Sequence, residues 1–343
     1  MKHIRMWIEA PISSGVAEWL VCPKNKCGMS IPSLKNRFEK LHISKRAALK
    51  NSSNENIKNL WADSSTKNIK SDSLLLFNTA LSAQRILANQ QREEATLHLL
   101  GLPVQGSSIR ILTESLSANI ISDWSKMTES LPGFLFNFIR KAIQSQLPTL
   151  ANLARWGRVS SSCCPLCQAI QTNKHVLSNC SQPDALIRFT GRHNLILELL
   201  AGWFTTKLDQ NFTLFVDLPG SKFKQTIDMF TSFRPDLVLV NFKNKISIVI
   251  ELTVCHETNM RSSKIYKETK YKDLDNFKTE LIRDHRIVLT TCELSVLGFL
   301  QFDSKTFNKL TIPTFDSNFI TRLSKTVIQS SFDIYTHRDV SNV

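Results

Sequence analysis

The segment from residue 235 to 254, PDLVLVNFKNKISIVIELTV, constrains the fold more than any other part of the sequence. Two runs rich in Val, Ile and Leu lie on either side of Lys243-Asn244-Lys245, and this composition predicts two β-strands, over 236–242 and 246–254, that form a hairpin. Both faces of each run are apolar, which is typical of strands inside a covered sheet. The segment therefore predicts a domain built on a buried sheet.

The elements that flank this hairpin predict the class of the domain. We expect further elements at the following positions: a helix over about 186–207, strands over 212–217 and 286–302, a charged helix near 257–284 and a last helix around 316–330. Helices that alternate with strands in this order indicate an α/β or α+β domain around a mixed sheet.

The first 150 residues predict a helical region. Its amphipathic stretches, punctuated by Gly and Pro, lie near 34–49, 73–100, 109–130 and 134–150. Between Ile31 and Lys70, nine Lys or Arg residues stand against three acids, which suits a helical surface that faces phosphates. A solvated helix face explains the same charges equally well.

The overall charge of the chain favours a polyanionic partner. Its 343 residues contain 43 Lys or Arg and 29 Asp or Glu, a formal net charge of +14. Nucleic acid is the leading partner on this basis, and an anionic membrane surface is second. No apolar run approaches the roughly 18 residues that span a bilayer, and the first residues lack a secretion signal. We therefore expect an intracellular protein.

Three cysteines and one histidine form a C-x2-C-x7-H-x4-C pattern: Cys164, Cys167, His175 and Cys180. Four such ligands match a closed tetrahedral Zn²⁺ site, which is structural rather than catalytic. Residues 155–182 show no hydrophobic period and bury little on their own, so a metal would have to hold them. The alternative is a set of buried free cysteines, with Cys163 as a competing ligand.

The remaining cysteines do not predict a disulfide framework. Eight cysteines are few for a chain of this length, so we expect a reducing compartment. Cys22 and Cys27 have a C-x4-C spacing without a second half nearby, which favours structural thiols. Basic residues surround the Cys/His pattern and suit a nucleic-acid backbone: Arg155, Arg158, Lys174 and Arg188.

Two acids interrupt the apolar hairpin, Asp236 and Glu251. A two-residue turn on Lys243-Asn244 would place them directly opposite each other across the strands. A turn centred one residue later would make them diagonal neighbours on the same face, whereas a three-residue loop would turn one away. Two of the three registers therefore bring the acids together.

Paired carboxylates in a sheet predict a metal site. Like charges this close repel unless a cation lies between them, and two carboxylates with a few waters are a usual protein contribution to a Mg²⁺ site. We therefore expect Mg²⁺ or Mn²⁺ at Asp236 and Glu251. The alternative is a pair of acids at strand ends, each bound by Lys or Arg.

The charged helix that follows the hairpin offers three lysines, Lys264, Lys267 and Lys270, with Tyr271 at i+4 from the second. One lysine aimed at the acids could orient a water and neutralise a phosphate, as metal-assisted phosphodiester hydrolysis requires. The spacing does not choose among the three.

The preceding helix holds further candidates. Arg192, His193 and Glu198 could face the same site, although helix capping and surface polarity explain an Arg-His-Asn sequence as well.

Taken together, these motifs resemble the C-terminal part of site-specific non-LTR retrotransposon polyproteins, which carry a restriction-like endonuclease. The Cys/His pattern resembles the CCHC knuckle of that family. The R-H-N, P-D…(D/E) and K-x3-Y elements of the family are matched by Arg192-His193-Asn194, Pro235-Asp236, Glu251, Lys267 and Tyr271. Residues 293–300, ELSVLGFL, resemble its closing strand, and residues 19–34 resemble more loosely the segment after the reverse transcriptase core.

The resemblance implies a PD-(D/E)xK nuclease fold, a divalent metal and nicking of chromosomal DNA whose free 3′ end primes reverse transcription. It selects Lys267 as the catalytic lysine, supported by Tyr271, and it implies a nuclear location. DNA is the implied partner, with element RNA as a further one and no small-molecule substrate. Residues expected to contact DNA are Arg192, His193, Arg158 and Lys174.

The resemblance also divides the chain into three expected parts. These are a thumb-end and linker region over 1–150, a zinc knuckle over 151–182 and an endonuclease domain over 183–343. The chain has no Asp-Asp pair, so a polymerase palm is missing and we expect a truncated copy of an element. Thr253 stands two residues after Glu251, where ordinary restriction-type nucleases have lysine. The alternative function is a catalytically inactive, nucleic-acid-binding remnant.

Overall fold

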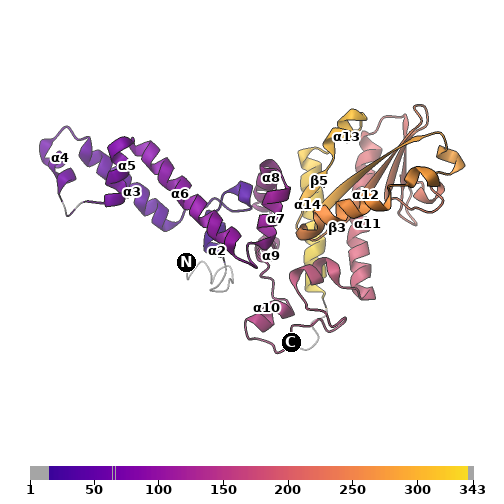
Figure 1. The fold of residues 1–343 in the computed structure, drawn as a ribbon, viewed down its shortest axis with the longest axis horizontal. Coiled ribbons are helices and arrows are strands. Elements are labelled where there is room, and N and C mark those ends of the chain that lie inside the picture. The colour runs from indigo at the N-terminus through magenta and orange to yellow at the C-terminus, as the bar shows by residue number, and fades with distance from the viewer. Residues whose placement is uncertain (1–14, 64, 66, 339–343) are drawn as a thin grey trace. The chain divides into compact units, whose positions relative to one another are not determined.

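The computed structural model describes residues 15–63, 65 and 67–338, and it divides between Ile109 and Arg110 into two compact units. The first unit is helical (Figure 1). Its helices are α2 (Val16–Val21), α3 (Leu34–Lys50), α4 (Glu55–Ala62), α5 (Ile69–Phe77) and α6 (Ala80–Gly101), and α7 (Ser107–Ser115) crosses the division.

Side-chain caps explain where the helices of the first unit begin. At the starts of α3 to α6, a Ser, Asn or Thr side chain accepts a hydrogen bond from a backbone N–H of the first turn. These caps are Ser33, Asn54, Asn68 and Thr79. The last cap corrects the sequence prediction of one helix over 73–100, because the chain ends α5 and starts α6 there.

A small apolar core holds the first unit together. Ile43 and Ala47 of α3 pack against Leu75 of α5 and Leu87 of α6. Arg46 of α3 is buried beside this core, and its Nε lies 2.7 Å from Oδ1 of Asp72. Because this buried cation is paired with a carboxylate, α3 and α5 are tied together by charge as well as by packing.

The second unit contains a five-stranded sheet with helices around it (Figure 1). Its strands are β1 (Phe212–Val216), β2 (Leu237–Asn241), β3 (Ile246–Cys255), β4 (Arg286–Ser295) and β5 (Leu300–Phe302). Its helices after α7 are α8 (Ala118–Thr128), α9 (Gly133–Ile143), α10 (Leu150–Arg155), α11 (Pro183–Lys207), α12 (Met260–Lys270), α13 (Ser304–Lys309) and α14 (Ser317–Thr336).

The sheet is mixed, as the sequence predicts. The strands lie in the order β1-β2-β3-β4-β5, and neighbours are antiparallel except for β3 and β4, which are parallel. The crossover between the parallel strands contains α12, and α12 packs on β3 and β4. Helix α11 runs behind the sheet in Figure 1 and contacts β1, β3 and α14.

The register of the central hairpin is the one in which the acids oppose each other. Leu237 is paired with Ile250 and Asn241 with Ile246, which leaves a four-residue loop over 242–245. This loop is longer than a two-residue turn, yet it preserves the pairing that such a turn would give. Asp236 directly precedes β2, and Glu251 follows Ile250 on β3, so the two acids come face to face.

Several element boundaries differ from the sequence prediction. The charged helix expected near 257–284 is helical only in α12, because Tyr271 ends it and two short 3-10 turns follow. The strands expected over 286–302 are β4 and β5, separated by a turn at Gly298, whose φ of 89° is a conformation that glycine adopts readily. The stretch 109–130 is two helices, since Ser117 caps α8.

The boundary between the two units differs from the boundaries predicted from the sequence. The division at 109/110 lies within the segment 1–150, and α8, α9 and α10 belong to the unit that holds the sheet. The functional boundaries at residues 150 and 182 stay predictions. Among the helices that the structure describes, none is both long and apolar enough to span a bilayer.

Candidate active site and metal cluster

The hairpin itself orients the two acids. The backbone N–H of Asp236 donates to Oε1 of Glu251 at 3.1 Å, and the backbone N–H of Leu252 donates to Oδ2 of Asp236 at 2.8 Å. Each carboxylate is therefore fixed by the backbone of the opposite strand. The sequence prediction that the acids converge on one face of the sheet agrees with this geometry.

The two carboxylates lie in an environment that hardly tolerates two negative charges. The side chain of Glu251 is fully buried and that of Asp236 is 14% exposed. Burial and the charge of Asp236 raise the pKa of Glu251 to about 7, against the opposite effect of Lys267. Burial also raises the pKa of Asp236. The hydrogen bond and charge of His193, together with the charge of Lys267, lower it by more, so the pKa of Asp236 is lowered overall.

Among the three candidate lysines, Lys267 of α12 is the one that reaches the acids. Its Nζ lies 2.5 Å from Oε2 of Glu251 and 3.6 Å from Oδ2 of Asp236. By contrast, Nζ of Lys264 lies 3.8 Å from Glu268, and Nζ of Lys270 donates to the hydroxyl of Tyr271 at 3.1 Å. The geometry thus agrees with the choice of Lys267 that the family resemblance made.

Tyr271, predicted to support the lysine, is part of the apolar core beneath α12. It is buried with Val238, Val249 and Leu274, and its hydroxyl donates to the carbonyl of Arg234 at 3.4 Å. Nζ of Lys267 lies 5.9 Å from the centroid of its ring. Tyr271 therefore anchors the end of α12 on the sheet and lies beneath the catalytic candidate.

His193 of α11 also faces the acids; the sequence offered it both as a candidate for this site and as a DNA contact. Its Nε2 lies 3.5 Å from Oδ1 of Asp236, and its Nδ1 lies 3.3 Å from Oδ1 of Asn194. Burial lowers the pKa of His193, but the hydrogen bond and charge of Asp236 outweigh this effect and leave the pKa raised. His193 is therefore a neighbour of the carboxylate pair, one of the places that the sequence offered for it.

The structure corrects the prediction that Arg192 contacts DNA. Its side chain is 2% exposed, and its guanidinium donates to the carbonyl of Leu177 at 2.8 Å and to Oγ of Ser331 at 3.1 Å. Burial lowers the pKa of Arg192 to about 10. Arg192 therefore joins α11 to α14 and to the segment around His175, and no phosphate can reach it in this arrangement.

The other predicted DNA contacts lie on the surface. Arg158 is exposed, with its guanidinium 5.8 Å from the ring of Trp156. Lys174 is half-buried, and its Nζ donates to Oδ1 of Asn259 at 2.8 Å. Since Asn259 directly precedes α12, Lys174 connects the Cys/His segment to the helix that carries Lys267. Glu198, a further candidate, is exposed on α11.

The carboxylate site has the donor chemistry that a divalent cation requires. One oxygen from each acid, Oδ2 of Asp236 and Oε2 of Glu251, faces the ammonium group of Lys267, which places positive charge against both. Hard oxygen ligands of this type suit Mg²⁺ or Mn²⁺. The two acids could therefore hold one of these ions.

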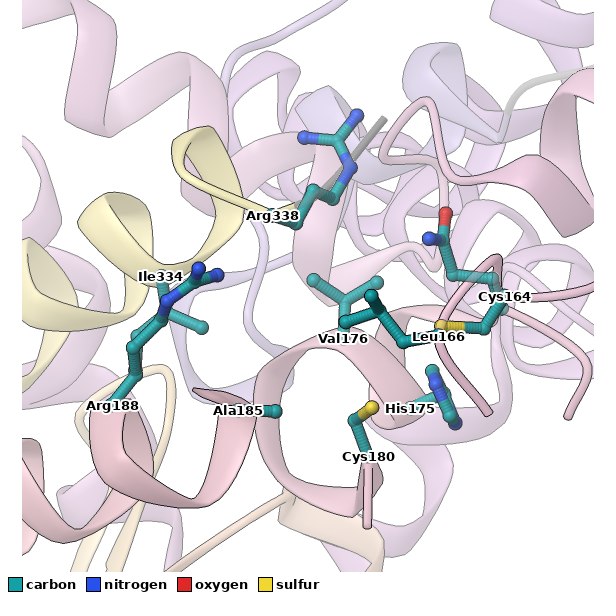
Figure 2. Close-up of a pocket in the computed structure, with 10 residues that line it drawn as sticks. Cys164, Leu166, His175, Val176, Cys180, Ala185, Arg188, Ile334 and Arg338 are labelled. Carbon is teal, nitrogen blue, oxygen red and sulfur yellow. The ribbon is translucent and has the colours of Figure 1, made fainter. Parts of the chain in front are cut away.

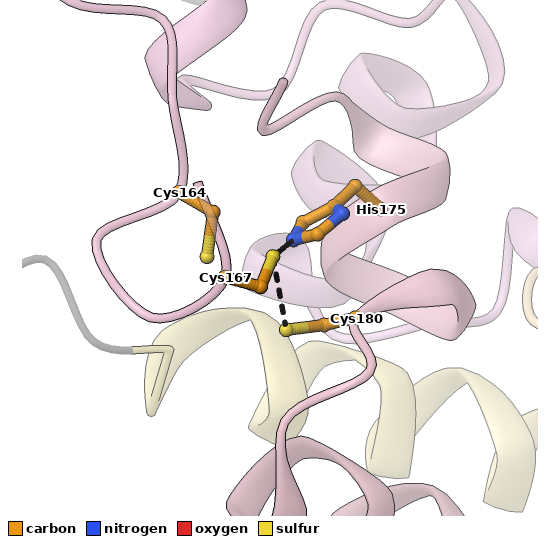
Figure 3. A group of neighbouring side chains, drawn as sticks. All are labelled: Cys164, Cys167, His175 and Cys180. Atoms are coloured by element: carbon orange, nitrogen blue, oxygen red, sulfur yellow. Dashed lines mark hydrogen bonds between the residues drawn. The ribbon is translucent and has the colours of Figure 1, made fainter. Parts of the chain in front are cut away.

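The Cys/His pattern folds into one compact cluster, which Figure 3 shows. The ligand atoms of Cys164, Cys167, His175 and Cys180 all lie within 4.8 Å of one another. Sγ of Cys167 lies 3.4 Å from Nε2 of His175 and 4.0 Å from Sγ of Cys180. Tetrahedral zinc with bonds of about 2.0 to 2.3 Å separates its ligands by roughly 3.5 to 3.8 Å, so the cluster could hold a metal such as zinc.

Local backbone structure brings these four ligands together. A tight turn, in which the N–H of Gln168 donates to the carbonyl of Cys164 at 2.9 Å, places the first two cysteines side by side. A single π-helical turn, His175–Asn179, carries the histidine and leads to Cys180. Burial raises the pKa of Cys164, but backbone N–H donors from Cys167 and Leu166 outweigh it and leave that pKa lowered, whereas burial raises the pKa of Cys180 to about 11.

A small cavity of about 30 Å³ lies beside the cluster (Figure 2). Arg188 of α11 and Arg338 after α14 line it together with Cys164 and His175. Arg188 donates to the carbonyl of His337 at 2.6 Å, and Arg338 donates to the carbonyl of Pro148 at 2.8 Å. These arginines therefore fasten the C-terminal end of α14 beside the cluster.

The comparisons with known proteins assign no family. The sequence matches no protein-family model and no curated protein. The geometry of the two sites is therefore the ground for any functional assignment.

Proposed function

We propose that this chain is a metal-dependent DNA endonuclease module of the type found in site-specific non-LTR retrotransposons. The observation that supports the proposal most directly is the position of Lys267, whose ammonium group contacts both members of the paired acids. A buried pair of carboxylates beside a lysine is an arrangement that metal-assisted phosphodiester hydrolysis can use. The mixed sheet, with the acids on β3 and just before β2, is consistent with a restriction-like nuclease fold.

Each residue of the site has a distinct part in this proposal. Asp236 and Glu251 hold Mg²⁺ or Mn²⁺, which when bound lends positive charge to the phosphate under attack. Lys267 orients the attacking water or neutralises the developing charge on the phosphate. His193 orients Asp236 through its Nε2, and Tyr271 keeps α12 in place on the sheet.

The Cys/His cluster has a structural role in the proposal. We propose that it holds Zn²⁺ as a closed knuckle, because three thiols and one imidazole leave no position open for a substrate. The knuckle would present Arg158 and Lys174 to the DNA backbone. A net charge of +14 is consistent with such binding, and DNA as substrate implies a nuclear location.

The test is nicking of a supercoiled plasmid by the purified zinc-loaded chain in Mg²⁺ or Mn²⁺. We expect nicked circles from the wild type and none from Asp236→Asn or Glu251→Gln. Asp284→Asn is the matched control, because Asp284 is an exposed acid of the same unit that pairs with Lys245 at 3.1 Å. This control should nick as the wild type does.

DNA binding without cleavage would support the alternative function instead. In that case the chain would retain plasmid in a gel-shift assay, with affinity falling steeply as salt rises. No nicked product would form with either metal. Such a result would identify a nucleic-acid-binding remnant and refute the endonuclease proposal.

A further inference from the structure

The four oxygens of the paired acids differ in what they face. Oε1 of Glu251 accepts the backbone N–H of Asp236, and Oδ1 of Asp236 lies 3.5 Å from Nε2 of His193. The other two, Oδ2 of Asp236 and Oε2 of Glu251, face Nζ of Lys267 at 3.6 and 2.5 Å. Among the described residues, Lys267 is the one cationic side chain that contacts both acids. A cation of the chain itself therefore lies where the two carboxylates meet.

A metal ion that bridges the two acids would need the place that this ammonium group holds. Carboxylate oxygens bind Mg²⁺ at about 2.0 to 2.1 Å. Nζ of Lys267 already lies 2.5 Å from Oε2 of Glu251, so an ion on that side of the oxygen and the ammonium group exclude each other. The two cations would also repel strongly, because Glu251 is fully buried and little water screens its charge. A bridging ion therefore requires Lys267 to leave the acids.

The position of Lys267 on α12 allows this movement. Its side chain is 19% exposed, against 14% for Asp236, so the lysine has access to solvent. Lys267 lies in the last turn of α12, where the partial negative charge of the helix end favours a cation. The four-carbon stem of a lysine is flexible. The ammonium group can therefore turn away from the acids while buried Tyr271 keeps the end of α12 on the sheet.

We propose that Lys267 is an internal competitor of the metal ion, which holds the place between Asp236 and Glu251 in the metal-free chain and is released when Mg²⁺ or Mn²⁺ binds. This inference deepens the proposed function, on which it rests. Lys267 becomes available to the water or the phosphate only after its release, so metal binding transfers the lysine from the acids to the substrate. The apparent affinity for the metal is lowered by the fraction of molecules in which Lys267 contacts the acids.

Titration with Mn²⁺ tests the inference independently of cleavage. Free Mn²⁺ gives a six-line electron paramagnetic resonance signal, so titration of the zinc-loaded full chain measures the ions bound and their affinity. We expect Lys267→Met to bind Mn²⁺ about tenfold more tightly than the wild type, as follows if Lys267 contacts the acids in about nine of ten metal-free molecules. Adding Asp236→Asn to Lys267→Met should remove this ion, because it removes one of the two acids.

Two controls separate release of the lysine from a general loss of positive charge. Lys270→Met removes a charge from the same turn of α12, but Lys270 donates to Tyr271, so this variant should bind Mn²⁺ as the wild type does. Acylation of the wild type by an N-hydroxysuccinimide ester, followed by peptide mass spectrometry, reports the freedom of each amine. Saturating Mg²⁺ should raise the acylation rate of Lys267 about tenfold, as its free fraction rises from about one-tenth to nearly one. The rate at Lys270 should stay constant.

The possible outcomes separate this inference from the proposed function. Equal or weaker binding of Mn²⁺ by Lys267→Met would overturn the competition and leave the metal site at the acids intact. An acylation rate of Lys267 that Mg²⁺ does not change would overturn it as well. No binding by either the wild type or Lys267→Met would overturn both the inference and the metal-dependent function. If Lys267→Met does not fold, as judged by its zinc content, the acylation of the wild type decides.

Discussion

Asp236 and Glu251 are each fixed by the strand that carries the other, since the N–H of Asp236 donates to Glu251 and the N–H of Leu252 donates to Asp236. This exchange leaves little freedom to either carboxylate. The site is therefore preorganised before any ligand binds. Substitution of either acid should change the activity of the site more than the backbone structure around it.

Replacing Lys267 by methionine tests the lysine that contacts both acids. We expect Lys267→Met to lower the nicking rate on the order of 100-fold or more, because the positive charge at the phosphate is lost. Single-turnover nicking measures this effect. Lys270→Met is the control, since Lys270 is exposed and directed at the hydroxyl of Tyr271. Equal rates for the two variants would contradict the role of Lys267.

Replacing His193 by alanine distinguishes a role at the acids from a role on DNA. We expect His193→Ala to weaken metal-dependent nicking by roughly 10- to 100-fold, through a higher requirement for Mg²⁺, because Asp236 loses its orienting partner. DNA affinity measured without divalent metal should be unchanged. A loss of that affinity would instead support the original DNA-binding prediction. His98→Ala, an exposed histidine of the first unit, provides the control.

The raised pKa of Glu251 predicts how stability depends on pH when Mg²⁺ and Mn²⁺ are absent. Its pKa is about 7 in the folded chain and 4.5 as a reference value, so the folded state binds the proton more tightly. The contribution of this carboxyl group to the free energy of unfolding is fully present below about pH 4.5 and is lost as the pH rises towards 7. This contribution is at most about 3 kcal/mol.

Urea unfolding between pH 4.5 and 8 measures this dependence. The difference in the free energy of unfolding between the wild type and Glu251→Gln should change across that pH range, because glutamine cannot titrate. Glu198→Gln, at an exposed glutamate, should follow the wild type throughout. A constant difference for Glu251→Gln would show that its carboxyl keeps an ordinary pKa.

Replacing Cys167 by serine tests the Cys/His cluster. We expect Cys167→Ser to release about one zinc per chain and to expose residues near 160–182 to hydrogen exchange, because this segment has little core of its own. Cys163→Ser is the matched control, since Cys163 lies next to Cys164 but outside the cluster. Full zinc retention in metal analysis of Cys167→Ser would refute the ligand set.

The sequence predicted best the features that depend on local periodicity. Continuous apolar runs rich in β-branched residues identify the central strands, and the symmetry of the hairpin about its loop brings Asp236 and Glu251 together. Ligand spacing likewise identifies the Cys/His cluster. These signals lie within segments of about 20 residues, where chain geometry leaves few alternatives.

Contacts between distant segments were not predictable in the same way. Arg192 and His193 are neighbours on α11, yet one is buried against Leu177 and the other faces Asp236. Their roles depend on how α11 packs, which an Arg-His-Asn sequence does not encode. The pairing of Thr253 with Glu293 was likewise not predictable, because it follows from the parallel pairing of β3 and β4 across the crossover that contains α12.

The link between Arg192 and Leu177 has a consequence for the chemistry of the whole unit. Leu177 lies between two ligands of the Cys/His cluster, and the residue after Arg192 touches the carboxylate pair. Thiolates are the part of this arrangement that oxidants attack. The carboxylate site contains no sulfur, yet Arg192 and His193 join it to the cysteine cluster through α11, so in the proposed endonuclease we expect oxidation of Cys164, Cys167 or Cys180 to shift the position of His193 beside Asp236.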